Sequence, residues 1–467
     1  MGESIDMLFS SIEFLFRFLP AFMLIYLLVP EKYRNLVLFS GSLLFYGIGE
    51  PYYVLIFICS ILINYGLNYL LASMKKGRKV ILVLSLAMNF GLLFIFKYWN
   101  FTAVNLNRLM AGELFPILSL ALPLGISFYT FQMVSYLIDN YRGRIAGKVS
   151  FISYGTYVSM FPQLIAGPIV RYQEIGERLA KRKVRMRDIE SGMKLFCIGL
   201  AFKVLFANQI GTLWNTIMTA GAGNLSIAAA WLGAIAYSFQ IYFDFWGYSL
   251  MAVGLGRMLG FSIPKNFDHP YMAKSISDFW RRWHITLGRW FREYVYLPLG
   301  GNRKGYLRTS FNLFIVWTFT GLWHGASWNF VLWGIVFFLL LCLEKSGFGN
   351  WIEHTKVLGH LYVLFFIPIT WVIFSVDDLN QLLLYLQNMV GIHTSAVLVG
   401  YGQVLRYLKE YGMLLILCLI FSTGYPAALY RKFKYRWYTV ILLLFAFWIS
   451  VYEIIIGKNN PFLYFRF

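Results

Sequence analysis

The chain has 467 residues, of which 59% are hydrophobic and 13% are charged, and its mean hydropathy is +0.62. Soluble domains carry about 25% charged residues, so this composition excludes a soluble globular protein and predicts a chain whose solvent is lipid. A net charge of +20 indicates nucleic-acid binding in a soluble protein. Here it is better explained by basic loops beside anionic lipid head groups, and we expect no nucleic-acid partner.

Apolar segments recur along the whole chain. A bilayer core about 30 Å thick requires about 20 apolar residues per helix, and the pattern predicts about 12 crossings, with about 11–13 as the expected range. We interpret residues 1–467 as one all-α, polytopic membrane domain. The predicted spans are 10–30, 36–50, 52–72, 80–97, 113–137, 190–214, 225–260, 310–326, 328–343, 358–376, 411–430 and 437–456.

Basic loops predict the orientation of these spans, because Lys and Arg are retained on the cytoplasmic side. The N-terminus is acidic and has no basic leader, so we expect a retained first span with the N-terminus outside. Segment 149–170 lies between two basic loops and contains Pro162 and Pro168, which interrupt helices. We therefore predict a re-entrant or in-plane segment that lines an internal cavity. The basic loops are 75–79, 141–148, 177–188, 281–308 and 431–436.

His324 is the first candidate functional residue. It lies in VWTFTGLWHGASWNFVLWG, residues 316–334, among tryptophans and glycines. Ionisable groups inside a membrane are energetically unfavourable and usually functional, and the glycines permit close approach of a ligand or another backbone. The alternative is a histidine hydrogen-bonded between packed helices, to Ser327 or Asn329. We expect Trp323 and Asn329 to line a cavity beside His324.

His284 is the second candidate, within DFWRRWHITLGRWFREYVYLPLGGNRKG, residues 278–305. If 278–295 is one helix, His284 shares an aromatic face with Trp280, and the arginines lie apart. Such a helix can simply lie at the membrane surface. The functional alternative presents His284 to a cavity and the arginines to an anionic acyl donor, because guanidinium groups bind phosphate bidentately. The candidate donor-binding residues are Arg281, Arg282, Trp283, Arg289 and Asn302.

Two more polar residues interrupt an apolar run. Gln240 and Asp244 lie one helical turn apart in YSFQIYFDFWGYS, and a charge there requires a partner or water. Asp244 either orients a cation or a histidine, or holds two helices together. We expect both residues to line the cavity.

Other chemistries lack their motifs. The chain has no GxxxxGK[ST] loop, no HExxH and no GxSxG elbow, and its four cysteines lie in apolar runs without metal-type spacing. No metal site is expected. The remaining histidines fall in a turn (His269) or near the ends of loops and spans (His354, His360 and His393), where we expect no catalytic role.

The two histidine segments resemble those of the membrane-bound O-acyltransferase family, in particular the branch containing the alginate O-acetylation membrane protein. Similarity extends to LPLGISFYTFQMVSYLID (122–139), FPQLIAGPIVRY (161–172) and FDFWGYSLMAVGLGRMLGF (243–261), and to the opening FSSIEFLFRFLP and the ending NNPFLYFRF. The resemblance therefore covers nearly the whole chain. It implies a ring of helices around a central cavity through the membrane, with the acyl donor reaching it from the cytosol and the acceptor from outside.

The resemblance also assigns roles. His324 matches the family histidine regarded as catalytic, and His284 matches one regarded as essential or supporting. A neutral imidazole is available near neutral pH, so we expect His324 to take the proton of an acceptor hydroxyl that attacks the acyl carbonyl. A covalent acyl-histidine stays an open alternative. No bound cofactor is expected; the donor is expected to be acetyl-CoA or another activated acyl compound.

The resemblance further implies a bacterial cytoplasmic membrane and O-acetylation of an exported polysaccharide, such as an alginate-like exopolysaccharide or peptidoglycan. It implies a separate extracytoplasmic SGNH-type partner. The first alternative is a D-alanyl transferase of teichoic acid supplied by a small acyl-carrier protein. The second is a transporter or flippase without chemistry, which the single broken segment and the lack of a matching repeat disfavour.

Overall fold

The computed structural model describes residues 7–145, 147–165, 167–392, 397–457 and 463. These residues are mainly helical, and the only β-type pairing recorded among them is an isolated bridge between Leu225 and Val399. The all-α prediction is therefore confirmed.

The chain divides into two compact units, Met1–Phe196 with Tyr248–Pro264, and Cys197–Gly247 with Lys265–Phe467. Two of the three inner boundaries fall inside helices, one in α10 (Met186–Ala201) and one in α12 (Ile227–Met258), and the third lies in the loop after α12. The single domain expected from the sequence stays a prediction.

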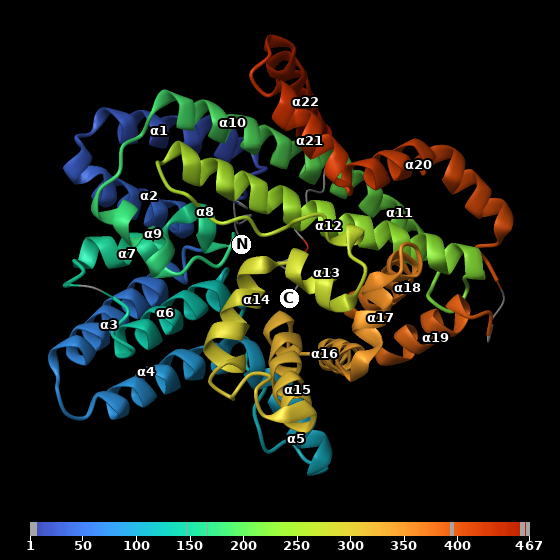
Figure 1. The fold of residues 1–467 in the computed structure, drawn as a ribbon, viewed down its shortest axis with the longest axis horizontal. Helices are drawn as coiled ribbons and strands as arrows, with labels where there is room; N and C mark the ends of the chain where they lie inside the picture. Colours follow the sequence, from blue (N-terminus) through green and yellow to red (C-terminus); the bar gives the residue numbers. More distant parts are fainter. Residues whose placement is uncertain (1–6, 146, 166, 393–396, 458–462, 464–467) are drawn as a thin grey trace. The chain divides into compact units, whose positions relative to one another are not determined.

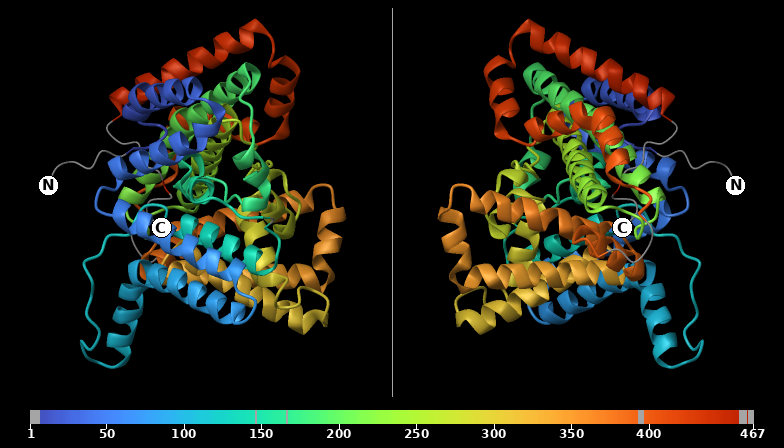
Figure 2. Two further views of the ribbon diagram at one scale, coloured as in Figure 1. Left: turned by 90° about the vertical axis from the view of Figure 1, so that its left-hand side faces the viewer. Right: turned by 90° about the vertical axis from the view of Figure 1, so that its right-hand side faces the viewer.

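The first unit is built largely from helices in the first 200 residues (Figure 1). Helices α3, α4 and α6 lie side by side, and α2 packs on α7 (Figures 1 and 2). A cluster of phenylalanine rings, including Phe18, Phe45 and Phe161, forms its core. The helices are α1 (Leu19–Leu28), α2 (Arg34–Gly49), α3 (Val54–Ser73), α4 (Arg78–Leu93), α5 (Trp99–Leu109), α6 (Ile126–Tyr141), α7 (Phe151–Ser159), α8 (Phe161–Leu164) and α9 (Tyr172–Ala180), with η1 (Phe14–Phe18), η2 (Glu31–Tyr33) and η3 (Phe94–Tyr98).

The second unit contains both candidate histidines. Its central pair is α15 and α16, which run antiparallel and pack on each other along their length. The helices are α11 (Gln209–Thr219), α13 (Ile276–Arg282), α14 (Ile285–Phe291), α15 (Gly305–His324), α16 (Trp328–Leu343), α17 (Gly349–His354), α18 (Leu358–Ser375), α19 (Leu379–Met389), α20 (Tyr401–Phe421), α21 (Gly424–Phe433) and α22 (Trp437–Ile456), with η4 (Phe202–Asn208), η5 (Pro270–Met272), η6 (Arg292–Tyr296) and η7 (Glu344–Phe348).

Glycines set the close approach of α15 and α16. A side chain at Gly321 would collide with the carbonyl of Phe330, and one at Gly334 with the carbonyl of Trp317. The two backbones can approach this closely only because both residues lack a Cβ. The glycines predicted to allow close approach therefore serve another backbone.

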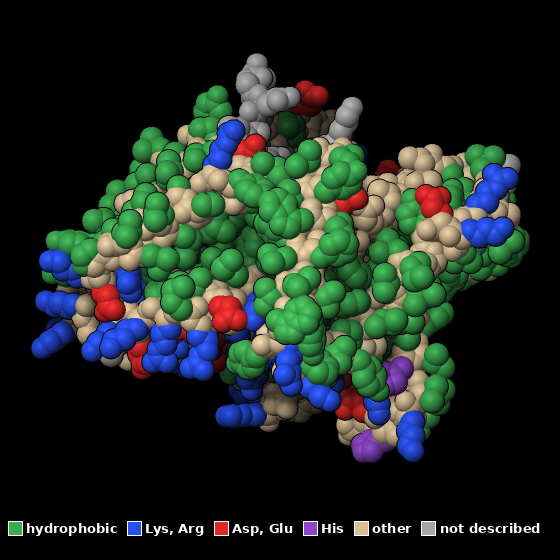
Figure 3. All heavy atoms as spheres, turned by 90° about the horizontal axis from the view of Figure 1, so that it is seen from above, with side chains coloured by type: hydrophobic (Ala, Val, Ile, Leu, Met, Phe, Trp, Pro, Cys, Tyr) green, Lys and Arg blue, Asp and Glu red, His purple; other side chains and the backbone are tan. Residues whose placement is uncertain are grey.

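Hydrophobic side chains cover most of the surface seen in Figure 3, as expected of a protein in lipid. Among the described residues, six helices are long and apolar enough to cross a bilayer, or seven if the bent pair α20–α21 counts as one span. The predicted number of crossings stays a prediction, because several predicted spans coincide with shorter helices that length alone does not assign. The six are Val54–Ser73, Arg78–Leu109, Met186–Thr219, Trp328–His354, Leu358–Ser375 and Trp437–Ile456.

The predicted span 113–137 is wrong. Its first part is non-helical, and α6 begins only at Ile126, after Gly125 with a φ of +72°. Side chains of Asn100 and Asn107, on α5, hold this part by hydrogen bonds to the backbone of Leu118 and Phe115. Figure 2 shows α5 and the extended segment after it projecting from the rest of this unit.

The predicted break in 149–170 is confirmed. Helix α7 ends at Ser159, Met160 leaves the helical region (φ −49°, ψ 111°), and α8 is a single turn that contains Pro162. Residues 154–165 are buried, as required of irregular backbone at membrane depth. Its re-entrant path and its place at a cavity stay predictions.

Candidate functional site

His284 lies at a break between two short helices. Helix α13 ends at Arg282, Trp283 is extended, and His284 has a left-handed conformation (φ +44°, ψ +52°) before α14 begins. The predicted continuous helix over 278–295 is therefore wrong, and so is its single aromatic face. Left-handed backbone is unfavourable for a non-glycine residue and persists only when its surroundings enforce it.

Asn266 enforces this break. Its carbonyl oxygen accepts from the N–H of Ile285 (3.0 Å), and its side-chain Oδ1 accepts from the N–H and the hydroxyl of Thr286 (3.1 and 2.9 Å). These bonds satisfy N–H groups in the first turn of α14, which have no partner within the helix. The loop at Asn266 thereby fixes the direction in which α14 leaves α13.

The same Asn266 oxygen fixes the tautomer of His284. The Thr286 N–H can only donate, so the Asn266 amide atom that accepts from it is the oxygen and not the nitrogen. His284 Nδ1 lies 3.2 Å from this oxygen and must carry the proton. The basic lone pair of the neutral ring is therefore on Nε2.

Burial keeps this ring neutral. The side chain of His284 is 1% exposed and lies outside the candidate membrane-spanning helices. Burial lowers the pKa of its imidazole to about 3, although a backbone hydrogen bond acts in the opposite direction. His284 is therefore a neutral base at physiological pH.

His324 occupies the last position of α15, inside an aromatic cage. Its ring makes edge contacts with Trp323, Trp333 and Phe374, at centroid distances of 4.9, 5.1 and 5.2 Å. These rings come from α15, α16 and α18, so three helices meet at this imidazole. The residue is 5% exposed.

Trp323 joins the two histidines. Its indole contacts the ring of His324, and it also lies 5.9 Å, centroid to centroid, from the ring of His284. Phe245 of α12 covers the other part of His284 at 4.7 Å. The two imidazoles, 40 residues apart in the sequence, therefore belong to one aromatic cluster.

A cavity of about 540 Å³ opens beside this cluster, between α13, α14, η6 and α15. Arg281, Arg289 and Arg292 contribute cations to its lining, while Trp280 and Thr320 contribute apolar and hydroxyl surface. Neither histidine lines it. Thr320 lies one turn before His324, and Trp333 contacts both Trp280 (5.7 Å) and His324.

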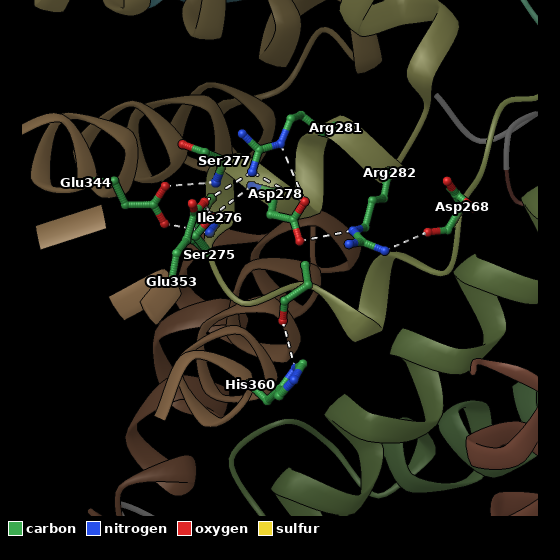
Figure 4. A network of polar contacts seen from close by, with 11 residues as sticks. Asp268, Ser275, Ile276, Ser277, Asp278, Arg281, Arg282, Glu344, Glu353 and His360 are labelled. Atoms are coloured by element: carbon green, nitrogen blue, oxygen red, sulfur yellow. Dashed lines mark hydrogen bonds and ion pairs between the residues drawn. The ribbon is translucent and has the colours of Figure 1, made fainter. Parts of the chain in front are cut away.

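A polar network anchors α13 beside the cavity (Figure 4). The carboxylate of Glu344, on the far end of α16, accepts from the N–H groups of Ile276 (2.5 Å) and Ser277 (2.8 Å). Glu353 accepts from the hydroxyl of Ser275 and pairs with Arg281. Anions at a helix N-terminus complement its dipole, so these two carboxylates fix the helix that carries Trp280.

The predicted donor-binding residues divide into two groups. Arg281 and Arg289 line the cavity, and Arg281 also pairs with Asp278 at 3.4 Å. Arg282 pairs with Asp278 at 3.0 Å and is not among the lining residues, while Asn302 is exposed on the loop before α15. Trp283 is buried against Phe279 and Trp371.

The predicted cavity-lining residues mostly have other neighbours. Asn329 donates to the carbonyls of Ile373 (3.3 Å) and Phe374 (3.1 Å), so it ties α16 to the end of α18. Gln240 is buried against Gly211 of α11. Of the four residues expected at the cavity, only Trp323 touches a candidate histidine.

Asp244 pairs with a cation, which is one of the two roles predicted for it. Its Oδ1 lies 2.7 Å from Nζ of Lys203, which belongs to η4, and both side chains are buried. Asn208 accepts a further hydrogen bond from Lys203, and the N–H of Leu463 donates to Asp244 Oδ2. This ion pair also holds α12 against η4, which is the second predicted role.

The other histidines lie outside this cluster. His269 lies in the predicted turn before Pro270, His354 Nδ1 donates to the carbonyl of Asn350 (2.6 Å), and His360 Nδ1 lies 3.1 Å from the carbonyl of Ala273. His393 lies outside the described residues.

Sequence reasoning missed Asn266, Phe245 and Glu344. Asn266 follows Pro264 in a loop 18 residues before His284, and no local spacing links the two. Glu344 offered a signal, since a carboxylate that closes the apolar run of α16 requires a partner.

Together these features describe a helical membrane protein with two clustered imidazoles and a cation-lined cavity, an arrangement suited to group transfer. A family model described as MBOAT, membrane-bound O-acyltransferase family, matches residues 52–387, which include both histidines, Asn266 and the lining of the cavity. The chain belongs to this family and is an O-acyltransferase.

Relatives agree with this assignment. The chain is 38% identical over 381 residues to "Probable alginate O-acetylase AlgI" of Pseudomonas putida, covering 80% of this chain and 78% of the relative. It is 36% identical over 430 residues to the peptidoglycan O-acetyltransferase of Helicobacter pylori, covering 83% and 80%. The teichoic acid D-alanyltransferase of Bacillus subtilis is 28% identical over 243 residues, covering 50% and 61%.

Proposed function

We propose that this protein transfers an acetyl group from an activated cytoplasmic donor to a hydroxyl in the pathway that O-acetylates an exported polysaccharide. The names of the relatives that share most of the chain support the acetyl group and the polysaccharide. The observation that carries the proposal is the position of His324, which shares the indole of Trp323 with His284 and lies one helical turn from a cation-lined cavity.

The reaction requires one base and one leaving group. His324 takes the proton of the acceptor hydroxyl while the hydroxyl oxygen attacks the acyl carbonyl carbon. The new C–O ester bond forms as the C–S bond of a thioester donor breaks, and His324 returns the proton to the departing thiolate. His284, fixed by Asn266 with its lone pair on Nε2, orients the donor or assists this proton transfer.

The cavity beside α13 suits the donor. The guanidinium groups of Arg281, Arg289 and Arg292 match the phosphates of a nucleotide-bearing thioester such as acetyl-CoA. Trp280 and Trp317 offer apolar surface in the same cavity. Side-chain motion at Trp280 or Trp333 would connect this cavity with His324.

Membrane physics explains why the reaction is placed here. A charged donor cannot cross about 30 Å of hydrocarbon, whereas a transferring site within the bilayer makes the crossing unnecessary. We place the protein in the bacterial cytoplasmic membrane, with the arginine-lined cavity facing the cytosol. An extracytoplasmic SGNH-type enzyme or the polysaccharide itself then accepts the acetyl group.

The test replaces His324 with Gln, which keeps the polar volume but removes the base. We expect a loss of at least about 100-fold in polysaccharide O-acetylation, the range of general-base catalysis. His354→Gln is the matched control, because His354 is exposed at the end of α17. Normal acetylation by a correctly expressed His324→Gln protein would refute the role of His324.

The D-alanyl alternative predicts a different donor. It is supported by a relative that matches half of this chain. Transfer of D-alanine from a carrier protein, with no transfer of acetate, would favour that alternative and overturn the acetyl assignment.

A further inference from the structure

A second large cavity lies in the first unit, whereas both histidines belong to the second. It measures about 1100 Å³ and lies where α3 and α6 end and where α4 and α7 begin. The transfer reaction proposed above assigns no role to it.

The lining of this cavity is strongly cationic. Lys75, Arg78 and Lys148 line it, and no carboxylate does. Within the described part of the chain these three cations form no ion pair. The nearby carboxylate of Asp139 lies 3.5 Å from Arg144 instead. Three positive charges therefore face one cavity without a protein counterion among the described residues.

Arg78 makes the floor of this cavity rigid. Its Nε donates to the carbonyl of Leu71 (3.1 Å), and its Nη2 donates to the carbonyls of Asn140 (3.2 Å) and Tyr141 (3.1 Å). The guanidinium thus ties the end of α3 to the end of α6. Carbonyl oxygens are neutral, so these bonds orient the positive charge without neutralising it.

A second hydrogen-bonded pair completes the floor. Asn140 Nδ2 donates to the carbonyl (3.0 Å) and to Oδ1 (3.2 Å) of Asn68. Asn68 is 4% exposed, so this floor is built before any ligand arrives. Lys75 and Lys148 are exposed and complete the lining from two different loops.

The cavity also has an apolar side. Tyr69 and Met74 line it, and they are 56% and 44% exposed. The candidate span Val54–Ser73 ends here, and the next span, Arg78–Leu109, begins here. The end of a membrane-spanning helix lies at the depth of lipid head groups. The cations and the apolar side chains of this cavity therefore lie at the boundary between the phosphate head group and the acyl chains of a phospholipid.

We propose that this cavity binds the phosphate head group of an anionic phospholipid, with Lys75, Arg78 and Lys148 around the phosphate and Tyr69 and Met74 along the acyl chains. Anionic lipids attract basic groups next to the membrane surface, and the Lys ammonium group binds phosphate as a point charge. The lipid holds the loops 74–77 and 147–149 together across the cavity. This site is independent of the proposed acyl transfer.

The test measures binding of fluorescent phosphatidylglycerol to the purified full-length protein in neutral detergent. The variant Lys75→Gln/Lys148→Gln should bind at least about tenfold more weakly, and Lys75→Arg/Lys148→Arg should keep wild-type binding. Arg78 is left intact because it clamps two helices. The matched control is Lys76→Gln/Lys79→Gln, which removes two exposed charges from the loop before α4 and the start of α4 without changing the cavity lining.

Competition separates the possible ligands. We expect unlabelled phosphatidylglycerol to displace the probe, and phosphatidylcholine or inorganic phosphate at the same concentration not to. Displacement by inorganic phosphate alone would indicate a free-phosphate site and overturn the lipid assignment. Equal loss of binding in the control, or unchanged binding in Lys75→Gln/Lys148→Gln with a wild-type melting temperature, would overturn the site itself.

Discussion

Asn266 is the residue on which the state of His284 depends. One side-chain oxygen accepts from the backbone of α14 and from Nδ1 of His284, so helix direction and imidazole tautomer are set together. The hydrogen bond that one ring nitrogen of a histidine makes determines whether the other ring nitrogen carries a proton or a lone pair. This makes Asn266 a positioning residue, since it acts on the reaction through His284.

Asn266→Asp tests this role through pH. The carboxylate can still accept all three bonds from Thr286 and His284, but it adds a negative charge beside a ring whose pKa burial lowers to about 3. An opposite charge favours the imidazolium, so the pKa of His284 must rise. We expect the acid limb of kcat/KM for acyl transfer to move to higher pH between pH 5 and 8, because protonation removes the Nε2 lone pair.

Asn302→Asp is the control, since it adds the same charge on an exposed loop. Superimposable pH profiles for wild type and a folded Asn266→Asp protein would show that His284 need not be neutral.

Single residues also show what the sequence can predict. His324 and Asp244 were singled out because an ionisable group in an apolar run requires a reason, and His284 because it lies in a dense basic and aromatic block. The catalytic roles of the two histidines stay predictions. The roles of Trp283 and Asn329 were not predictable. Each packs or bonds to α18, about 45 to 90 residues away, and side chains at such separations have no shared sequence pattern.

At the scale of elements, α13 depends on the carboxylate of Glu344. This side chain is buried and accepts two backbone N–H groups. Glu344→Ala leaves those donors without their acceptor, and we expect the free energy of unfolding to fall by about 1.5–3 kcal/mol, the value of hydrogen bonds to a charged group. Thermal unfolding followed by tryptophan fluorescence measures the change.

Glu353→Ala provides the comparison for this prediction. The Glu353 side chain is 36% exposed and pairs with an exposed arginine, so its loss should change stability by less than about 1 kcal/mol. An equal melting temperature for Glu344→Ala and wild type would show that α13 needs no carboxylate cap.

Helix boundaries were predictable where proline or glycine interrupts the pattern and unpredictable elsewhere. Pro162 predicted the break after α7. The break at His284 contains neither residue and is made by hydrogen bonds from a distant loop, so local periodicity predicted a continuous helix. The non-helical segment before α6 does contain Pro116 and Pro123, so its break was predictable from the sequence and was missed because its apolar length was interpreted as part of one span.

At the scale of the whole molecule, composition alone predicted a helical membrane protein. The predicted number of crossings stays a prediction, because length and apolar composition identify six of the described helices and leave shorter ones such as α2 and α6 undecided.

The broken segment α7–α8 leads to a topology prediction. Helix α7 has nine residues, and at 1.5 Å per residue such a helix is too short to cross about 30 Å. We expect Ser150→Cys and Arg171→Cys, each in a background without native cysteines, to be labelled from the same side by an impermeant maleimide. Labelling of the two positions from opposite sides would show a complete crossing.

With His324 as the base, an acyl group reaches an acceptor across the membrane while the donor stays on its own side. The most direct measurement uses proteoliposomes with labelled acetyl donor on one side and the acceptor hydroxyl on the other. We expect label on the acceptor with wild-type protein, none with His324→Gln, and all donor retained on its own side. Transfer that requires donor and acceptor on the same side, or that persists in His324→Gln, would contradict this mechanism.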